Sequence, residues 1–372
     1  MQTDNIEIPD FIDITGGRPL APGARVGISG AKNEVLGAMC AAVLTDGPVT
    51  LCNVPFITDV LDLAAVLRGV GADVEYAPHE KRMRIHAKRI TSNILPDEAL
   101  KFRASYYVWG ALLSRFARTG EWGSLKIRIP GGCSFGGARA IDFHIRLLQN
   151  ALGARLAETA DSLEFVLPSG AAAPGGPVFH TPIFSHGATF HWMLATALGR
   201  GPKVFYNASL EPEVPHLLAM LNRMGANFRG RGSLAIMNSG FGGGLLGGGE
   251  FSIMPDRIET GFYALLAMAL RSRITLGGTN AESCRPWLNS VMEIAKKGCV
   301  EISADEMRFD FRALPGFEGR NYVMSPIPGK ETDMQQIWTP VLSMAKSPSA
   351  IYDPIWPGRT GHIAEMAKFG ID

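Results

Sequence analysis

A turn motif that recurs about every 72 residues constrains the fold of this chain more than any other feature of its sequence. Each copy is an apolar, helix-like run that ends at a glycine and leads into a β-rich run. The spacings between successive copies are 82, 72, 73 and 72 residues, and the five glycines are Gly71, Gly153, Gly225, Gly298 and Gly370. A period of this length indicates a repeated supersecondary unit, so the repeat determines the architecture.

Each repeat unit also opens in the same way, with a short polar segment followed by an apolar helix. The openings read SGAKNEVLGAMCAAVL, RASYYVWGALL, SHGATFHWMLATAL, DRIETGFYALLAMAL and TDMQQIWTPVLSMA. A β-rich run follows each opening, and a second helix, for example residues 60–69 or 214–224, leads into the glycine turn and a strand pair. The pattern predicts five tandem units of helix, strand, helix, strand, strand, in an α/β or α+β fold that packs helices against sheets.

The length of 372 residues suits two or three domains. A glycine-rich stretch, GFGGGLLGGG at residues 240–249, separates the third unit from the fourth and predicts a hinge. The first domain would then cover residues 25–239 with three units, and the second would cover residues 1–24 plus 250–372 with about two. Ligand contact is the weaker alternative for the hinge, because it does not run directly into a helix as a phosphate-binding loop must.

Composition excludes several classes of protein. Thirty-six Lys and Arg against 35 Asp and Glu leave a net charge of +1, which excludes a general nucleic-acid binder but leaves a local basic cleft open. No apolar stretch approaches the roughly 20 residues of a membrane span, and the N-terminus lacks the features of a secretory signal. Five cysteines without a C-x-x-C pair indicate neither disulfides nor zinc. We therefore expect a cytoplasmic protein with no metal and no cofactor.

Basic residues stand at several unit openings. Lys32, Arg103 and Arg257 lie at or beside predicted helix starts, where a cation opposes the helix dipole. Because backbone N–H groups and a side-chain cation would point the same way there, the repeated pattern indicates an anion-binding site. The alternative is that each cation pairs with a nearby carboxylate.

Cys133 is the candidate reactive thiol. It lies in IPGGCSFGGARAIDFH, a glycine-flanked loop that can expose a thiol, and Arg139 would favour the thiolate. The other four cysteines have apolar neighbours and are interpreted as small hydrophobic residues.

Three histidines and two carboxylates have plainer interpretations. His180, His186 and His191 lack metal-ligand spacing, so we expect structural or surface roles for them. Glu331 and Asp333 stand just before the fifth opening helix, where N-capping is the default role of a carboxylate.

Seven motifs carry a resemblance to a known family. They occur in the family's order from about Gly23 to the last residue: ISGAKN (28–33), FRAS (102–105), PGGC with GARAIDFH (130–144), SHGAT (185–189), EPEV (211–214), PDRIETG (255–261) and TDMQ (332–335). The chain resembles the UDP-N-acetylglucosamine 1-carboxyvinyltransferase family. The resemblance implies a two-domain inside-out α/β barrel of the enolpyruvyl transferase type, with an active site in the interdomain cleft. It also implies transfer of the enolpyruvyl group of phosphoenolpyruvate to a hydroxyl of a uridine nucleotide.

The resemblance assigns roles to individual residues. Lys32, Arg103 and Arg139 match the cations that hold phosphoenolpyruvate, and Asp333 matches the base near the accepting hydroxyl. Cys133 matches the general acid, for which the resemblance also implies a covalent adduct with the substrate. The catalytic set is then Cys133, Asp333 and Lys32, and the substrate-binding set is Asn33, Arg103, Arg139, Ser185, Gly187 and Arg359. Within the second set Asn33 would position the hydroxyl, and Arg359 matches another family arginine.

Two departures from the family pattern bear on the acceptor and the geometry. The loop after Cys133 has one glycine more than is usual, which shifts Arg139 relative to the thiol. Ile183 and Ala140 stand where the family commonly has a lysine for the diphosphate and a proline against uracil. A specialised paralogue that enolpyruvylates UMP, as in nucleoside antibiotic biosynthesis, is therefore the alternative to an enzyme that acts on the cell-wall precursor UDP-N-acetylglucosamine.

A third departure lies in the second domain. The printed sequence ends at Ile371 and Asp372, where the fifth unit should enter its strand pair, so the family's sixth unit does not lie within it. We expect apolar faces and strand edges to be exposed there. A homo-oligomer or other partner that covers them, a rebuilt second domain, and a non-catalytic nucleotide-binding remnant all remain open.

Overall fold

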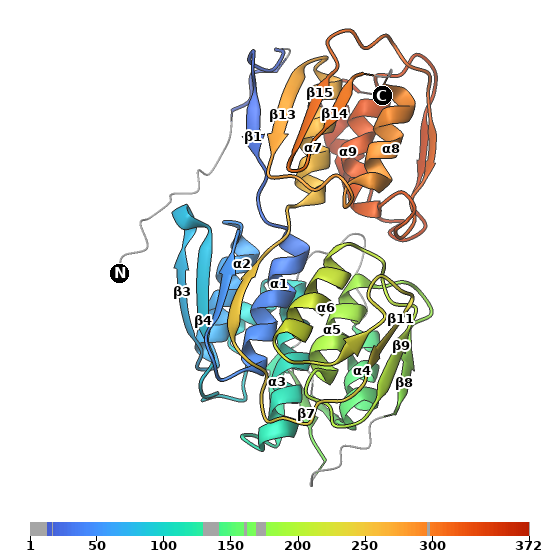
Figure 1. Ribbon diagram of the computed structural model, residues 1–372. Coiled ribbons are helices and arrows are strands. Elements are labelled where there is room, and N and C mark those ends of the chain that lie inside the picture. The colour runs from blue at the N-terminus through green and yellow to red at the C-terminus, as the bar shows by residue number, and fades with distance from the viewer. Residues whose placement is uncertain are drawn as a thin grey trace.

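The computed structural model describes residues 13–16, 18–128, 141–159, 162–168, 176–295 and 298–371, with Arg103 described by its backbone alone. These residues form two bodies, one above the other in Figure 1. The N-terminal body comprises residues 30–254 and holds the first three repeat units. The C-terminal body comprises residues 18–29 and 255–371 and holds the fourth and fifth.

The predicted order of helix, strand, helix, strand, strand is confirmed in four units. The first contains α1 (Lys32–Ala41), β2 (Val49–Cys52), α2 (Thr58–Gly69), β3 (Asp73–Ala77) and β4 (Arg82–His86). The second contains α3 (Tyr106–Thr119), β5 (Ser124–Arg128), α4 (Asp142–Leu152), β6 (Arg155–Glu158) and β7 (Ser162–Val166). The third contains α5 (His186–Thr196), β9 (Lys203–Tyr206), α6 (Glu213–Arg223), β10 (Phe228–Arg229) and β11 (Ala235–Asn238). The fourth contains α7 (Arg257–Ala269), β13 (Arg273–Gly277), α8 (Arg285–Ile294), β14 (Val300–Ile302) and β15 (Glu306–Asp310).

The fifth unit contains α9 (Gln335–Leu342), β17 (Ala350–Tyr352) and α10 (Gly361–Ala367). Short 3₁₀ turns precede two opening helices, at Arg103–Ser105 before α3 and at Thr332–Met334 before α9. Four strands outside the repeat pattern complete the sheets: β1 (Arg25–Gly27), β8 (Val178–His180), β12 (Gly249–Ser252) and β16 (Asn321–Val323).

The recurring glycines have the conformation that the turn requires. Gly71, Gly153, Gly225, Gly298 and Gly370 all have positive φ, between 64° and 109°. A residue with a Cβ is disfavoured in this region, whereas glycine enters it freely. The glycine turn therefore ends the second helix of each unit and redirects the chain toward the sheet.

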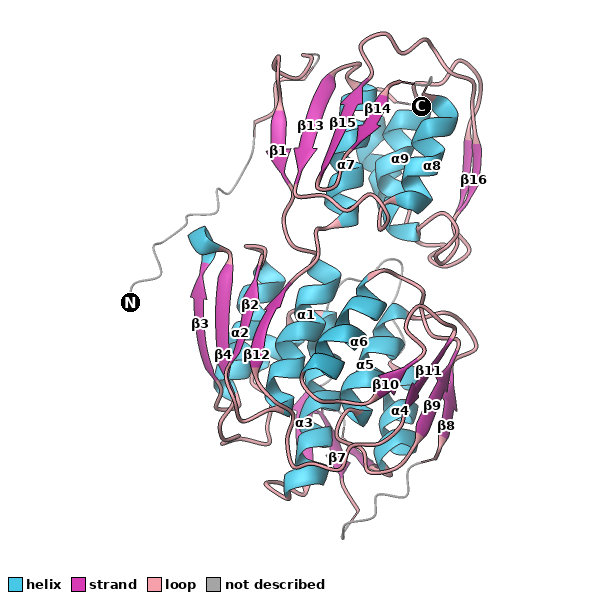
Figure 2. Cartoon of the chain, viewed as in Figure 1, coloured by secondary structure: helices cyan, strands magenta, loops and turns pink. Residues whose placement is uncertain are grey.

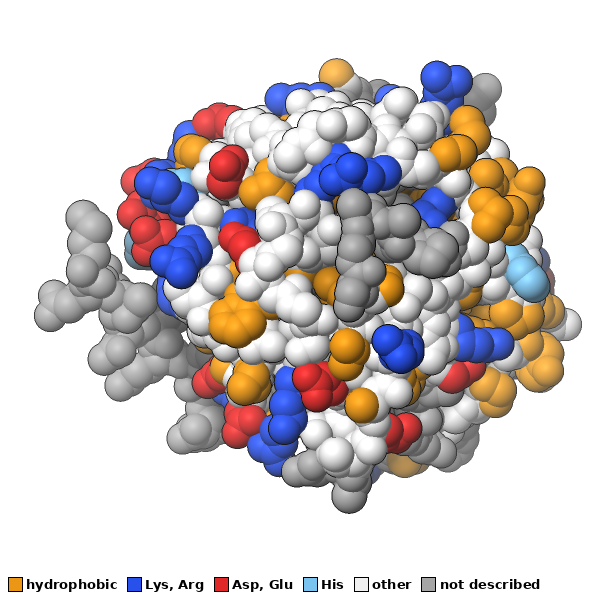
Figure 3. Space-filling model, turned by 90° about the horizontal axis from the view of Figure 1, so that it is seen from below, with side chains coloured by type: hydrophobic (Ala, Val, Ile, Leu, Met, Phe, Trp, Pro, Cys, Tyr) orange, Lys and Arg blue, Asp and Glu red, His pale blue; other side chains and the backbone are white. Residues whose placement is uncertain are grey.

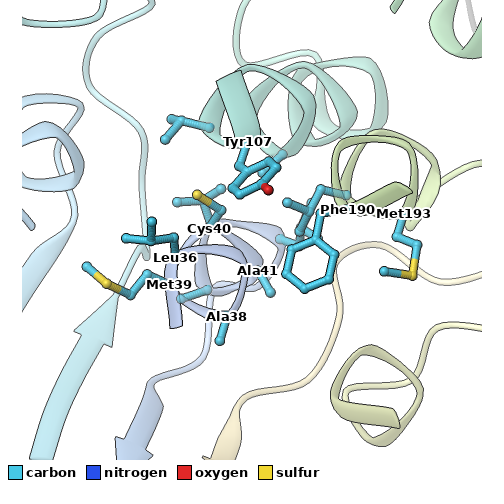
Figure 4. Packing of buried hydrophobic residues seen from close by; sticks show 14 of the residues in the cluster. Leu36, Ala38, Met39, Cys40, Ala41, Tyr107, Phe190 and Met193 are labelled. Atoms are coloured by element: carbon cyan, nitrogen blue, oxygen red, sulfur yellow. The ribbon is translucent and has the colours of Figure 1, made fainter. Parts of the chain in front are cut away.

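Helices fill the interior of the N-terminal body, and sheets cover the outside (Figure 2). The three opening helices α1, α3 and α5 contact one another, and nearly every side chain of α1 is buried. A helix that is buried all round needs apolar residues on every face, and the opening sequences supply them. Figure 4 shows side chains of α1 packed beside Tyr107 of α3 and Phe190 of α5. This is the inside-out arrangement that the resemblance implied.

Each four-stranded sheet joins strands of one unit to a strand from elsewhere in the chain. The orders are β12-β2-β4-β3, β10-β11-β9-β8 and β1-β13-β15-β14, and a three-stranded sheet has the order β5-β7-β6. In the first, β12 is parallel to β2, with Phe251 beside Leu51. In the C-terminal body, β1 is parallel to β13, with Val26 beside Leu276.

These strand pairings show that the boundary between the two bodies does not lie in the glycine-rich segment. The segment 240–249 packs on the N-terminal body, where Leu246 N donates to Leu44 O and β12 continues the first sheet. The chain instead crosses between bodies at two adjacent places, near Ser29 and near Pro255. The glycine content of residues 240–249 predicted a hinge there. The N-terminal body instead ends after β12, because β12 pairs with β2.

The C-terminal body exposes apolar side chains around its last elements. Tyr352, Ile363 and Phe369 are all more than half exposed, and Tyr352 and Ile363 line an open hollow of about 800 Å³ between α9, β17 and α10. Elsewhere charges are mixed: on the face of the N-terminal body seen in Figure 3, basic and acidic side chains are interspersed. No helix among the described residues is long and apolar enough to span a membrane.

Candidate active site between the two bodies

The two crossings are fastened side by side, and the opening helices α1 and α7 begin there. Ala31 N donates to Met254 O and Asp256 N donates to Ser29 O, each at 2.8 Å. Asp256 caps α7, because its carboxylate accepts from Ile258 N and Glu259 N. The same carboxylate accepts from Lys32 N at 3.1 Å, which ties the first turn of α1 to the first turn of α7.

Lys32 is the first residue of α1, as predicted. Its side chain is 52% exposed, and Nζ lies 2.7 Å from Asp59 Oδ2 of α2. Asn33 follows it and is half-buried. Lys32 thus has the carboxylate partner that the alternative interpretation expected, while its exposed amine stays accessible to an anion.

Arg257, the first residue of α7, joins the two bodies through a buried ion cluster. Its side chain is 2% exposed, Nε donates to Glu213 Oε1 at 3.1 Å, and Nη2 lies 3.5 Å from Glu211 Oε2. Nη1 contacts Glu331 Oε2. Burial alone would lower the pKa of Arg257, but Glu213 and Glu211 outweigh it and raise that pKa. Arg257 therefore pairs with carboxylates and is not available to a substrate anion.

His186 extends this cluster at the first turn of α5. Its Nε2 lies 3.9 Å from Glu211 Oε2, and its Nδ1 lies 3.4 Å from the Tyr107 hydroxyl. Burial raises the pKa of Glu211, against the lowering effect of His186 and Arg257, and the charges of Glu213 and Asp333 add to the rise. The charge of Asp333 therefore acts on the same cluster.

Asp333 and Arg359 form an ion pair in the C-terminal body. Arg359 Nη1 donates to Asp333 Oδ1 and to Thr332 O, both at 2.8 Å. Arg359 is mostly buried, whereas the Asp333 side chain is 40% exposed. Asp333 lies within the 3₁₀ turn Thr332–Met334, and no described side chain caps that turn, so the capping role expected by default is wrong. Arg359 instead fixes the carboxylate in an orientation that leaves it accessible.

Ser185 and Gly187 shape the first turn of α5. Ser185 is its N-cap, and Oγ accepts from Ala188 N at 3.2 Å. A Cβ on Gly187 would lie 2.5 Å from the Tyr106 hydroxyl, so only glycine allows this approach of α5 to α3. Both residues thus build the turn that presents His186 to Glu211.

Several predicted site residues lie outside what the structure describes. Cys133 and Arg139 fall in the segment 129–140, as does Ala140, and Arg103 is placed by its backbone at the start of the 3₁₀ turn before α3. The roles assigned to them remain predictions.

The remaining cysteines divide into two pairs. Cys40 and Cys284 are buried, and burial raises the pKa of both thiols, that of Cys284 to about 12. Cys52 and Cys299 are only partly buried, and Cys52 Sγ accepts from Arg82 at 3.3 Å. Interpretation as small hydrophobic residues therefore fits Cys40 and Cys284 but is incomplete for Cys52.

Sequence reasoning missed the carboxylate cluster around Arg257. The motifs EPEV and PDRIETG contain Glu211, Glu213 and Arg257, but nothing in one sequence showed that two motifs 44 residues apart would meet across the boundary of two bodies. The signal was present in the charge of EPEV, because two carboxylates at a buried helix start require a cation.

Comparisons with known proteins show the family of this chain. Residues 17–372 match the family model EPSP synthase (3-phosphoshikimate 1-carboxyvinyltransferase). The UDP-N-acetylglucosamine 1-carboxyvinyltransferase of Hyphomonas neptunium is 33% identical over 369 residues, which covers 98% of this chain and 82% of that protein. The enzyme of the same name from Maricaulis maris is 35% identical over 364 residues, with the same coverage.

Solved structures support the fold. The enolpyruvyl transferase NikO from Streptomyces tendae superposes with a TM-score of 0.79 at 20% identity, over 95% of this chain and 79% of that one. An EPSP synthase from Acinetobacter baumannii gives 0.56 at 14% identity, over 90% and 74%. The family match spans nearly the whole chain, and the two-body inside-out arrangement is shared. The chain therefore belongs to the EPSP synthase family and is an enolpyruvyl (carboxyvinyl) transferase.

Proposed function

We propose that this enzyme transfers the carboxyvinyl group of phosphoenolpyruvate to a hydroxyl of a uridine nucleotide and releases phosphate. The observation that carries the proposal is the 33–35% identity, over 98% of the chain, to enzymes named for that reaction on UDP-N-acetylglucosamine. The accessible Lys32 amine and the accessible Asp333 carboxylate, one in each body, give the site a cation for the donor and a base for the acceptor.

The chemistry assigns a task to each group. The acceptor oxygen attacks C2 of phosphoenolpyruvate while C3 gains a proton, and loss of a C3 proton and of phosphate from C2 then restores the vinyl group. Asp333, oriented by Arg359, takes the proton of the attacking hydroxyl, and Cys133 supplies the proton to C3. Lys32 holds the donor's negative charge at the start of α1, where the helix dipole adds to its attraction.

A nucleoside monophosphate such as UMP is the second candidate acceptor. Ile183 is 55% exposed, and Phe184 beside it is also exposed. An exposed apolar pair just before the Ser185 cap offers no charge to the diphosphate that UDP-N-acetylglucosamine carries. This local chemistry favours a smaller anion on the acceptor.

A panel of acceptors distinguishes the candidates. Phosphate release from phosphoenolpyruvate would be measured with UDP-N-acetylglucosamine, with UMP and with free N-acetylglucosamine. Release that depends on either nucleotide and not on the free sugar supports the proposal, and the larger kcat/KM names the acceptor. Release with none of them would overturn it. Binding of a nucleotide without turnover would instead fit a nucleotide-binding remnant.

Two further properties belong to this proposal. A cytoplasmic location fits substrates that are made inside the cell. A second copy of the chain is the partner we propose for the apolar side chains around Phe369, which sedimentation velocity of the purified protein would test by its mass in solution.

A further inference from the structure

The cluster at the first turns of α5 and α6 has the composition of a metal site. One ring nitrogen of His186 and one carboxylate oxygen each of Glu211 and Glu213 lie within 4.8 Å of one another. Glu213 is 1% exposed, and among the described residues its Oε2 has no hydrogen-bond partner. The Nε2 of His186 is likewise without one. A buried carboxylate oxygen and an imidazole nitrogen of one cluster, both without hydrogen-bond partners among the described residues, are explained by a ligand that contacts both.

The surroundings of the cluster prepare His186 to coordinate a cation. Its Nδ1 faces the Tyr107 hydroxyl at 3.4 Å, which leaves Nε2 directed toward Glu211. Metal-bound histidines are commonly held in this way through their second ring nitrogen.

The charge of the cluster also calls for a cation. Among the described residues, the carboxylates of Glu211, Glu213 and Glu331 surround the guanidinium of Arg257, so carboxylates outnumber cations in this largely buried place. Arg257 occupies Glu213 Oε1 and so leaves the Oε2 side open. Asp333 does not change this excess, because Arg359 pairs with it.

We propose that His186, Glu211 and Glu213 bind one divalent transition-metal ion, such as Zn²⁺ or Mn²⁺, between α5 and α6. Imidazole with two carboxylates suits these ions, and three protein ligands would leave a coordination position for water or a substrate oxygen. Donor atoms around a tetrahedral ion lie about 3.4 Å apart, so binding would draw these three side chains together by about 1 Å. The histidine spacing in the sequence did not predict this site, because its other ligands come from the EPEV motif.

Titration calorimetry on the full chain, purified in chelator and then dialysed, tests the site with Zn²⁺ alone and with Mn²⁺ alone. We expect one ion per chain for the wild type and at least a tenfold weaker affinity for His186→Ala and for Glu213→Gln. Tyr107→Phe, which removes only the outer hydrogen bond, should weaken binding about 10-fold to 100-fold.

Matched controls keep the test decisive. His180→Ala removes an exposed histidine of β8, and Glu75→Gln removes an exposed carboxylate of β3, so both should bind as the wild type does. If Glu213→Gln fails to fold, His186→Ala and Tyr107→Phe still test whether the cluster binds the ion. No stoichiometric binding by the wild type, or equal affinity in His186→Ala, would overturn the proposal.

Discussion

Replacement of Arg257 by methionine removes a guanidinium that faces three carboxylates at the junction of the two bodies. The Arg257 and Glu213 side chains are almost fully buried, and Glu331 nearly so. Removing one partner of a buried ion pair leaves an uncompensated charge and costs about 3–5 kcal/mol. We therefore expect Arg257→Met to lower the free energy of unfolding by that amount at pH 8, although methionine fills much of the same volume.

The pH dependence of this loss follows from the carboxylates left behind. Burial already raises the pKa of Glu211, and loss of Arg257 removes a charge that lowers this pKa, so the folded variant binds a proton at Glu211 more tightly than the unfolded chain does. Its stability then falls as pH rises through the folded pKa of Glu211. The deficit relative to the wild type should be smaller at pH 5 than at pH 8.

Urea unfolding followed by circular dichroism at both pH values measures the effect. Arg285→Met is the matched control, because Arg285 forms an exposed pair with Glu282 on α8 and its loss should cost less than about 1 kcal/mol. Equal losses for Arg257→Met and Arg285→Met, or a deficit for Arg257→Met that does not change with pH, would refute the reasoning.

Three other expectations can be checked with the same protein. The hydrogen bond that His216 Nδ1 donates to the Glu34 carboxylate raises the pKa of His216 against the effect of burial, so stability from this pair is fully present below about pH 6.5 and is lost as pH rises through the folded pKa. Wild type should therefore lose more stability in urea between pH 6 and 9 than His216→Gln, and equal losses would exclude the coupling. Gly225→Ala should lower the free energy of unfolding by about 1–2 kcal/mol, because φ at Gly225 is 109°. Gly123→Ala should be nearly neutral, because Gly123 has no positive φ and has open space around it. Similar melting temperatures for the two variants would contradict this expectation. Iodoacetamide on the native protein should label Cys133 and leave Cys40 and Cys284 unlabelled, because burial raises the pKa of the Cys40 and Cys284 thiols. Phosphoenolpyruvate should protect Cys133 from the reagent. Mass spectrometry that finds Cys40 labelled at the same rate as Cys133 would count against a selective thiol.

The repeat made most of the fold predictable from the sequence. Gly71 and its four counterparts mark turns whose backbone only glycine adopts easily, so a local requirement recurred at a visible period. The opening helices were equally visible, because burial on every face leaves a continuous apolar run. The boundary near Ser29 and Pro255 was not visible, because it depends on β12 pairing with β2 about 200 residues away.

The site was predictable where one residue carries the signal and not where several must meet. Lys32 at the start of α1 and Asp333 before α9 are found where the motifs placed them. Arg257 was interpreted as a ligand for anions, but its position between Glu211 and Glu213 depends on how the two bodies meet. His186 had no metal spacing in the sequence, and only the approach of α5 to α6 gives it carboxylate neighbours.

The central claim is that Lys32 in one body and Asp333 in the other act on the same pair of substrates, and steady-state kinetics of two variants tests it most directly. Lys32→Ala should weaken phosphoenolpyruvate binding by a charged contact of about 1.5–3 kcal/mol, seen mainly as a higher KM. Asp333→Asn keeps the shape of the side chain but removes the base, so kcat should fall by about 10²–10⁴ with little change in the Kd of the nucleotide. An Asp333→Asn enzyme with wild-type kcat, or one that has lost only nucleotide affinity, would contradict the account.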